Sequence, residues 1–197
     1  EAPDSENEAL WIAETVENRL TRNPHERVAV LYRTNSQSRQ IEEALRRYGR
    51  KYVVVGGFSF YQRSEVKDTL AYLKVLVSPH DSISLLRVIN TPARGIGRTT
   101  MEQVEQYALR QEVSLWTALE QMLETHAFPG RAEAALTAFH RMMTELAAQL
   151  ESRPVAQTLA DVLERTGYRK MLEEEGTEDA RTRLANLDEL LNAAADA

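Results

Sequence analysis

The chain has 197 residues, which allows one large domain or two small ones, and 43% of them are apolar, which is enough for a core. The absence of cysteine excludes disulfides, thiolate catalysis and cysteine-based zinc sites, and it fits a cytoplasmic protein. The net charge of −6 argues against a chain that binds nucleic acid over its whole surface, and no apolar run is long enough to span a bilayer.

The first part of the chain predicts a small α/β unit in the order helix, strand, helix, strand. Residues 5–20 place apolar side chains along one helical stripe, with acids opposite. Residues 28–32 and 52–55 are short apolar runs rich in β-branched residues, typical of strands buried on both faces of a parallel sheet. Residues 37–48 predict the helix between them, so we expect a right-handed parallel βαβ unit.

After Gly57 the pattern becomes helical. Apolar periodicity, prolines and glycines predict helices at residues 65–77, 82–90, 100–110, 114–123, 131–150, 154–167 and 168–175, and from 177 toward the end. The expected fold class is therefore α/β plus all-α, a small parallel βαβ piece followed by a larger helical part. We place the boundary between residues 57 and 65.

One turn between two expected helices combines charge with flexibility, in the order Arg94, Gly95, Ile96, Gly97 and Arg98. Its glycines can adopt a positive φ or let another backbone approach, and its isoleucine can anchor the turn in a core. Thr99 or Thr100, followed by Glu102 or Gln103, predicts the N-cap of the next helix. The arginines and free amides suit a nucleic-acid backbone. The alternative is an ordinary glycine turn with solvated arginines.

Positive charge gathers near the turns although the whole chain is acidic. Residues 19–51 carry nine Arg or Lys against three Glu, and residues 87–98 carry three Arg and no acid. A polar loop from Arg33 to Arg39 follows the first expected strand, and ligands of open α/β sheets bind beyond the carboxyl ends of strands. Its hydroxyls, amides and arginines suit phosphate oxygens. The alternative is helix capping with solvated arginines.

An aromatic segment, residues 58–63, follows the second expected strand. Phe58 and Phe60 are suited to stacking on exposed bases, and the alternative is hydrophobic packing at a domain junction. The sequence contains no phosphate loop, no metal-ligand spacing and no nucleophile motif. We therefore predict no catalytic residue, metal site or bound cofactor in this chain.

Taken together, these stretches resemble the second motor domain of UvrD/PcrA/Rep-type superfamily 1 DNA helicases. Residues 28–39 match the family's motif IV, and residues 52–68 match its following G-G-x-x-F…R-x-E-I-K-D block. The match continues through residues 88–97, and residues 183–190 are similar to the family's R-x-E-N-L-E-E-L. Residues 28–100 carry the densest match.

The resemblance implies that residues 1–57 belong to the RecA-like subdomain 2A and residues 58–197 to the helical insertion 2B. It also implies single-stranded DNA contacts at motif IV and duplex contacts at the T-P-x-R-G-I-G turn, which is similar to a helix-hairpin-helix element. The predicted DNA-binding residues are Arg33, Thr34, Asn35, Ser38, Arg39, Phe58, Phe60, Thr91, Arg94, Gly95, Ile96, Gly97, Arg98 and Thr99.

The family's phosphate loop, its Mg²⁺-binding acids and the motifs that follow 2B are missing. We therefore expect a fragment that alone neither hydrolyses ATP nor unwinds DNA. ATP and Mg²⁺ are expected in the parent, a 3′→5′ helicase of repair or replication, and the expected partners are DNA and the parent's other helicase domains, without a membrane. Two alternatives stay open: a helicase-like subunit of an AddA- or RecB-type nuclease complex, and a protein-interaction module.

Overall fold

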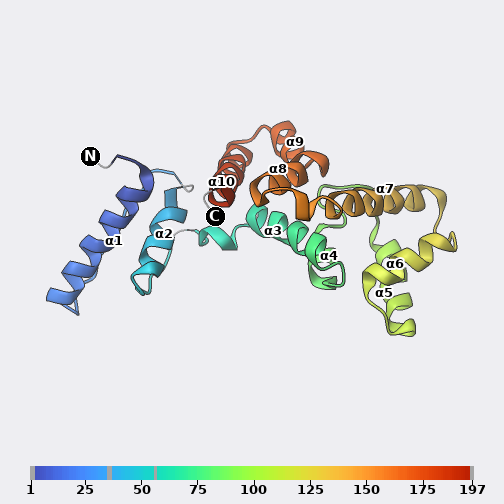
Figure 1. Ribbon diagram of the computed structural model, residues 1–197, viewed down its shortest axis with the longest axis horizontal. Coiled ribbons are helices and arrows are strands. Elements are labelled where there is room, and N and C mark those ends of the chain that lie inside the picture. The colour runs from blue at the N-terminus through green and yellow to red at the C-terminus, as the bar shows by residue number, and fades with distance from the viewer. Residues whose placement is uncertain (1–2, 35–36, 56, 196–197) are drawn as a thin grey trace.

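The computed structural model describes residues 3–34, 37–55 and 57–195 (Figure 1). Its elements are α1 (Ser5–Arg22), α2 (Ser38–Arg47), η2 (Phe60–Gln62), α3 (Ser64–Val77), α4 (Ser82–Val88), α5 (Arg98–Gln111), α6 (Leu115–Glu124), α7 (Gly130–Ala147), η3 (Leu150–Ser152), α8 (Val155–Arg165), α9 (Tyr168–Glu175) and α10 (Glu178–Ala195). Figure 1 shows an elongated molecule with α1 and α2 at one end and α5 and α6 at the other, while α10 returns toward α2.

The helices expected after residue 57 are present, with ends that differ by no more than a few residues. The breaks lie where the sequence predicts them. Pro154 is the N-cap of α8, and Gly176, with a φ of +65°, ends α9. A left-handed residue satisfies the last carbonyls of a helix at little cost only when it lacks a Cβ, which is why glycine marks this end.

The small RecA-like parallel βαβ piece is not present, so that prediction is wrong. Residues 28–32 and 52–55 belong to no strand, and no backbone hydrogen bond joins the two segments in the described ranges. A groove of about 780 Å³ is lined by both of them. The side chains of Leu31 and Val53 are 94% and 85% exposed. The fold of the described residues is all-α.

The prediction of strands at residues 28–32 and 52–55 failed because an apolar run is necessary for a buried strand but not sufficient for one. Such a strand needs neighbours that take its backbone hydrogen bonds and layers that cover both faces. Here Val30 and Tyr52 pack against α1 and α2, which covers only part of the two segments. The backbones of the two segments therefore form no ladder with each other.

Two of the apolar cores formed by the described residues lie toward opposite ends of the molecule. The small core between α1 and α2 contains Ala9, Ala13, Val16, Ala44 and Leu45. The large core joins α3 to α10, and its fully buried members include Leu85, Leu119, Leu136, Phe139 and Leu163. Full burial of one such large side chain contributes about 1.5–3 kcal/mol, so most of the hydrophobic stabilisation lies in the helical part.

A polar network joins α2 to the helical part. Arg63 donates from Nη2 to Ser38 Oγ and from Nη1 to Asn186 Oδ1, both at 2.7 Å. Asn186 in turn donates from Nδ2 to Glu65 Oε1 at 2.6 Å. All four side chains are buried, so each hydrogen bond offsets a desolvation cost that would otherwise oppose folding. The domain boundary between residues 57 and 65 stays a prediction.

Candidate nucleic-acid interface

The turn between α4 and α5 is shaped by Asn90. Its Oδ1 accepts hydrogen bonds from the amides of Arg94 (2.7 Å) and Ile96 (3.3 Å). Ile96 is 2% exposed and lies in the large core, which confirms that it anchors the turn. Gly95 has a φ of +78°, a conformation that is strained for a residue with a Cβ. The backbone of the turn therefore has one defined shape.

The Arg94 side chain is turned into the protein. Its Nη1 donates to the carbonyl oxygens of Pro92 (3.0 Å) and Val88 (3.2 Å). Its Nη2 donates to the Tyr72 hydroxyl (2.6 Å) and to the Thr166 carbonyl (3.1 Å). Burial raises the pKa of Tyr72 to about 12, although the nearby Arg94 acts in the opposite direction. Arg94 therefore fastens the turn to α3 and to the end of α8, and its contact with DNA stays a prediction.

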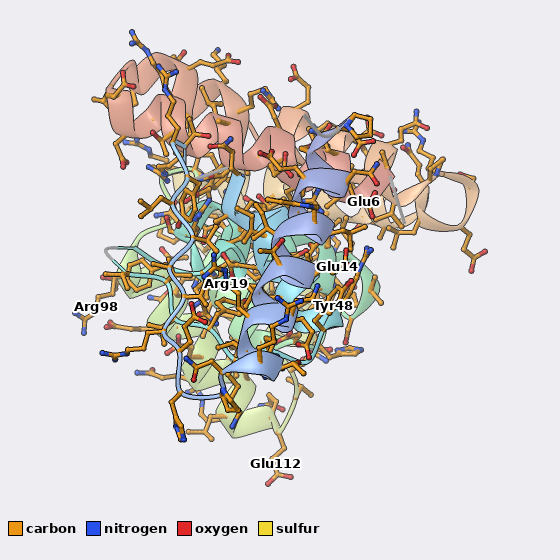
Figure 2. The ribbon with its side chains drawn as sticks, turned by 90° about the vertical axis from the view of Figure 1, so that its left-hand side faces the viewer. Glu6, Glu14, Arg19, Tyr48, Arg98 and Glu112 are labelled. Carbon is orange, nitrogen blue, oxygen red and sulfur yellow. The ribbon has the colours of Figure 1, made fainter. Side chains whose placement is uncertain are left out.

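The solvent side of the turn belongs to Arg98 and Thr99, which are both exposed. The Arg98 side chain is 92% exposed, and Figure 2 shows it projecting from the edge of the molecule. Its Nε donates to Glu102 Oε1 at 2.7 Å, one helical turn along α5. This side chain reaches furthest from the turn while its backbone is held from below.

The predicted N-cap of α5 at Thr99 or Thr100 is wrong. The cap is Gly97, in an extended conformation and without a side-chain hydrogen bond to the first helical amides. The helix begins at Arg98, two residues early, and Arg98 pairs with Glu102 along its face. The first amides of α5 therefore have no side-chain cap.

The side chain of Gln37 closes the loop that follows residue 32. The amides of Arg33 and Thr34 both donate to Gln37 Oε1 at 3.0 Å. The Arg33 side chain is exposed and forms no ion pair with any residue that the structure describes. Asn35, another predicted contact, lies outside the described residues.

Two predicted contacts from the same loop are buried. Ser38 is 1% exposed and accepts the hydrogen bond from Arg63. Arg39 is 5% exposed, and its Nε and Nη1 donate to Glu189 Oε1 (2.7 Å) and Glu43 Oε2 (3.0 Å). Burial alone lowers the pKa of Arg39, but these carboxylates outweigh it and raise the pKa. Both side chains position α2 against neighbouring helices.

The two phenylalanines have opposite surroundings. Phe58 is 74% exposed, whereas Phe60 is fully buried at the contact between η2, α3, α8 and α10. The amide of Phe60 donates to Glu42 Oε1 at 3.0 Å, and Glu42 also accepts from Ser59 and Tyr52. Burial alone raises the pKa of Glu42, but these hydrogen bonds outweigh it and lower the pKa.

The structure brings two of the three predicted groups together. The hydrogen bond from Arg63 to Ser38 and the one from the Phe60 amide to Glu42 join α2 to residues 58–63. The turn at residues 90–99 is separate, since no hydrogen bond or ion pair among the described residues connects it to either group. Thr91 is half-buried, its amide donates to the Val88 carbonyl at 3.1 Å, and its carbonyl oxygen accepts from Tyr72.

Sequence reasoning missed two residues at this turn. Asn90 carries a signal that was available, because Asn side chains commonly accept hydrogen bonds from turn amides. Arg131 carries none, because it follows Gly95 only after two intervening helices. Its Nε lies 4.0 Å from the position that a Cβ on Gly95 would occupy. Only the tertiary structure places this arginine beside the turn.

Neither a metal cluster nor a membrane segment is found in the described ranges. No three His, Asp or Glu side chains there are arranged to hold a metal ion. No helix of residues 3–34, 37–55 or 57–195 combines the length and apolarity needed to cross a membrane.

Comparison with known proteins agrees with the motif resemblance. All 197 residues match the UvrD-like helicase C-terminal domain. The chain is 35% identical along its whole length to the ATP-dependent DNA helicase PcrA of Staphylococcus epidermidis, of which it covers 27%. It is 39% identical over 165 residues, 84% of the chain, to PcrA of Bacillus subtilis, covering 22% of that protein. It thus spans about a quarter of these relatives' length, and it belongs to the UvrD-like helicase C-terminal domain family.

Proposed function

We propose that this chain is the DNA-binding and regulatory part of a longer, cytoplasmic ATP-dependent DNA helicase with 3′→5′ polarity that acts in repair or replication. Family membership and relatives named ATP-dependent DNA helicase support the proposal. The observation that carries it is the exposed turn at residues 95–99, which presents Arg98 on a firmly anchored backbone. In the proposal, this turn binds the phosphates of duplex DNA without reading their sequence.

A turn that binds duplex DNA needs a solvent-exposed cation and a backbone that is held in place by the rest of the protein. Arg98 supplies the charge, while Ile96 and Arg94 fix the backbone. No atom lies within 4 Å of the position of a Cβ on Gly97, so a DNA backbone has room to approach the amides. The exposed pair with Glu102 is worth only about 0.3–0.5 kcal/mol, and a phosphate can replace it.

Single-stranded DNA is proposed to run past Arg33, Thr34, Asn35 and Phe58. The exposed Arg33 supplies a cation near the start of α2, and Phe58 offers an exposed aromatic face. Stacking of a base on such a face is worth about 1–3 kcal/mol and tolerates any sequence. Because α2 and residues 58–63 are hydrogen-bonded together, both contacts belong to one surface in this proposal.

ATP and Mg²⁺ are assigned to other domains of the longer protein, which are also proposed as partners of this chain. The sequence has no phosphate loop, and the proposal gives the chain no part in hydrolysis. The purified chain is expected to show no ATPase activity with or without DNA. Hydrolysis above the background of a blank preparation would contradict this assignment.

The central experiment is fluorescence anisotropy with a labelled duplex that carries a single-stranded tail, titrated at several salt concentrations. The logarithm of the binding constant is expected to fall linearly with the logarithm of the salt concentration, with a slope of about −0.9 for each phosphate contacted. Arg98→Ala is expected to weaken duplex binding about fivefold, as for the loss of one exposed charge contact. Arg110→Ala is the matched control, because that exposed arginine lies about 18 Å further along α5.

Unchanged duplex binding by Arg98→Ala would contradict the proposal that this turn binds duplex DNA. Salt-independent or absent DNA binding would favour a protein-interaction module instead. The single-stranded surface is tested with Phe58→Ala, which is expected to weaken binding of a tailed duplex more than that of a blunt one. Val77→Ala, another exposed apolar side chain, serves as its control.

A further inference from the structure

We propose that Arg131, in the first turn of α7, is a second cation of the duplex-binding surface and contacts the DNA backbone beside Arg98. This inference rests on the proposed function and extends it from one helix to two. Nothing in the local sequence around residue 131 resembles a DNA-binding motif. The tertiary structure alone brings this side chain to the turn.

The geometry is the first support. The Arg131 Nε lies 4.0 Å from where a Cβ on Gly95 would sit, so the side chain lies beside the turn at Gly95, which is exposed. Gly95 and Arg98 are three residues apart, which separates their backbones by at most about 11 Å. A duplex carries one charge for every ~1.7 Å of its axis. The Nε of Arg131 and the backbone of Arg98 are therefore close enough for the two side chains to reach phosphates of one duplex.

The electrostatic surroundings are the second support. Arg131 is exposed, and within the described residues its guanidinium makes no ion pair and donates no hydrogen bond. The acid nearest in sequence, Glu133, is instead hydrogen-bonded to His126 at 2.6 Å. Other arginines of this region are engaged, Arg98 with Glu102 and Arg141 with Glu145 at 3.9 Å.

Arg131 lies at the end of its helix that repels cations and attracts anions. It occupies the first turn of α7, where the helix dipole is positive and where the acid of that turn, Glu133, is already hydrogen-bonded to His126. No side chain caps this end of the helix. An anion held between Arg131 and the Gly95 turn relieves that repulsion, and the backbone of a duplex already gripped by Arg98 supplies one. The arrangement therefore favours a phosphate contact over a solvated side chain.

The test compares duplex affinity and its salt dependence for wild type, Arg131→Ala, Arg131→Lys and Arg141→Ala. Arg141 is the matched control, since it is exposed on the same helix about 15 Å further along. Arg131→Ala is expected to bind a blunt duplex about fivefold more weakly, with a salt slope shallower by about 0.9. Arg131→Lys keeps the charge and is expected to stay within about twofold of wild type, as is Arg141→Ala.

The outcomes separate this inference from the function on which it rests. If Arg98→Ala weakens duplex binding while Arg131→Ala leaves both affinity and salt slope unchanged, the inference is wrong and the proposed function stands. If the wild-type chain does not bind duplex at low salt, both are wrong. Because Arg131 is exposed, its variants are expected to melt at the wild-type temperature, and the salt slope reports charge contact rather than folding.

Discussion

The large core of the helical part and the two apolar runs beside α1 and α2 differ in how far their side chains are buried. In the helical part, Leu119 and Phe139 are almost completely buried, whereas Leu31 and Val55 near α1 and α2 are 94% and 91% exposed. A helix satisfies its own backbone hydrogen bonds and needs a neighbour only for its apolar stripe. An extended segment must find partners for its backbone as well. An apolar pattern is therefore realised as packing only where the partners that it needs are present.

The largest expected effect is a loss of stability in the helical part. Phe139→Ala removes a side chain that is 1% exposed and is expected to lower the free energy of unfolding by about 4 kcal/mol, because a large core residue leaves a cavity. Leu31→Ala, its counterpart in the extended segment, is expected to change it by no more than about 0.5 kcal/mol. Urea unfolding followed by circular dichroism measures both, and equal losses would contradict the contrast.

The next effect separates the two arginines of the turn. Arg94→Ala is expected to lower the free energy of unfolding by about 3 kcal/mol, because it leaves the buried Thr166 carbonyl and Tyr72 hydroxyl without the donor that Arg94 supplies. Arg98→Ala is expected to cost no more than about 0.5 kcal/mol, since that side chain is 92% exposed. Thermal unfolding of both variants measures the difference. A destabilised Arg98→Ala would show that the exposed arginine also supports the fold.

A smaller effect acts at the contact between the two ends. Glu42→Gln is expected to cost about 2 kcal/mol at neutral pH, because the carboxylate accepts from the Phe60 amide and from two hydroxyls. Since the folded-state pKa of Glu42 lies below its ordinary value of 4.5, this stabilisation is complete above pH 4.5 and disappears as the pH falls through the folded-state pKa.

The difference in urea midpoint between wild type and Glu42→Gln is therefore expected to shrink in acid. A difference that stays constant between neutral and acid pH would show that lost packing, rather than lost charge, explains the variant.

The smallest effect sharpens the contrast at the turn. Glu102→Gln removes the carboxylate that competes with phosphate for Arg98, and it is expected to strengthen duplex binding about two- to threefold. Glu105→Gln, an exposed acid on the same helix, is the control for net charge. Equal gains in the two variants would mean that general repulsion, and not release of Arg98, explains the change.

The helices and the anchor of the turn followed from local pattern. An apolar residue between two glycines can pack into a core, so the sequence indicated Ile96 as the anchor of the turn. The sequence also predicted Ile96 as a DNA contact, which stays a prediction. The absence of strands at residues 28–32 and 52–55 was not predictable, because strand formation depends on neighbours that a local run of Val and Leu does not specify. The same limit applies to Arg94 and Arg98, which look alike in sequence and lie on opposite sides of one turn.

The sequence by itself determined where the chain is helical and which motifs resemble those of the helicase family. These properties depend on side chains within a few residues of each other. Only the tertiary structure decided that Arg94 and Phe60 point inward, that Arg98 and Phe58 point outward, and that Arg131 lies over Gly95. Those arrangements depend on contacts between residues far apart in the chain, where periodicity and spacing carry no information.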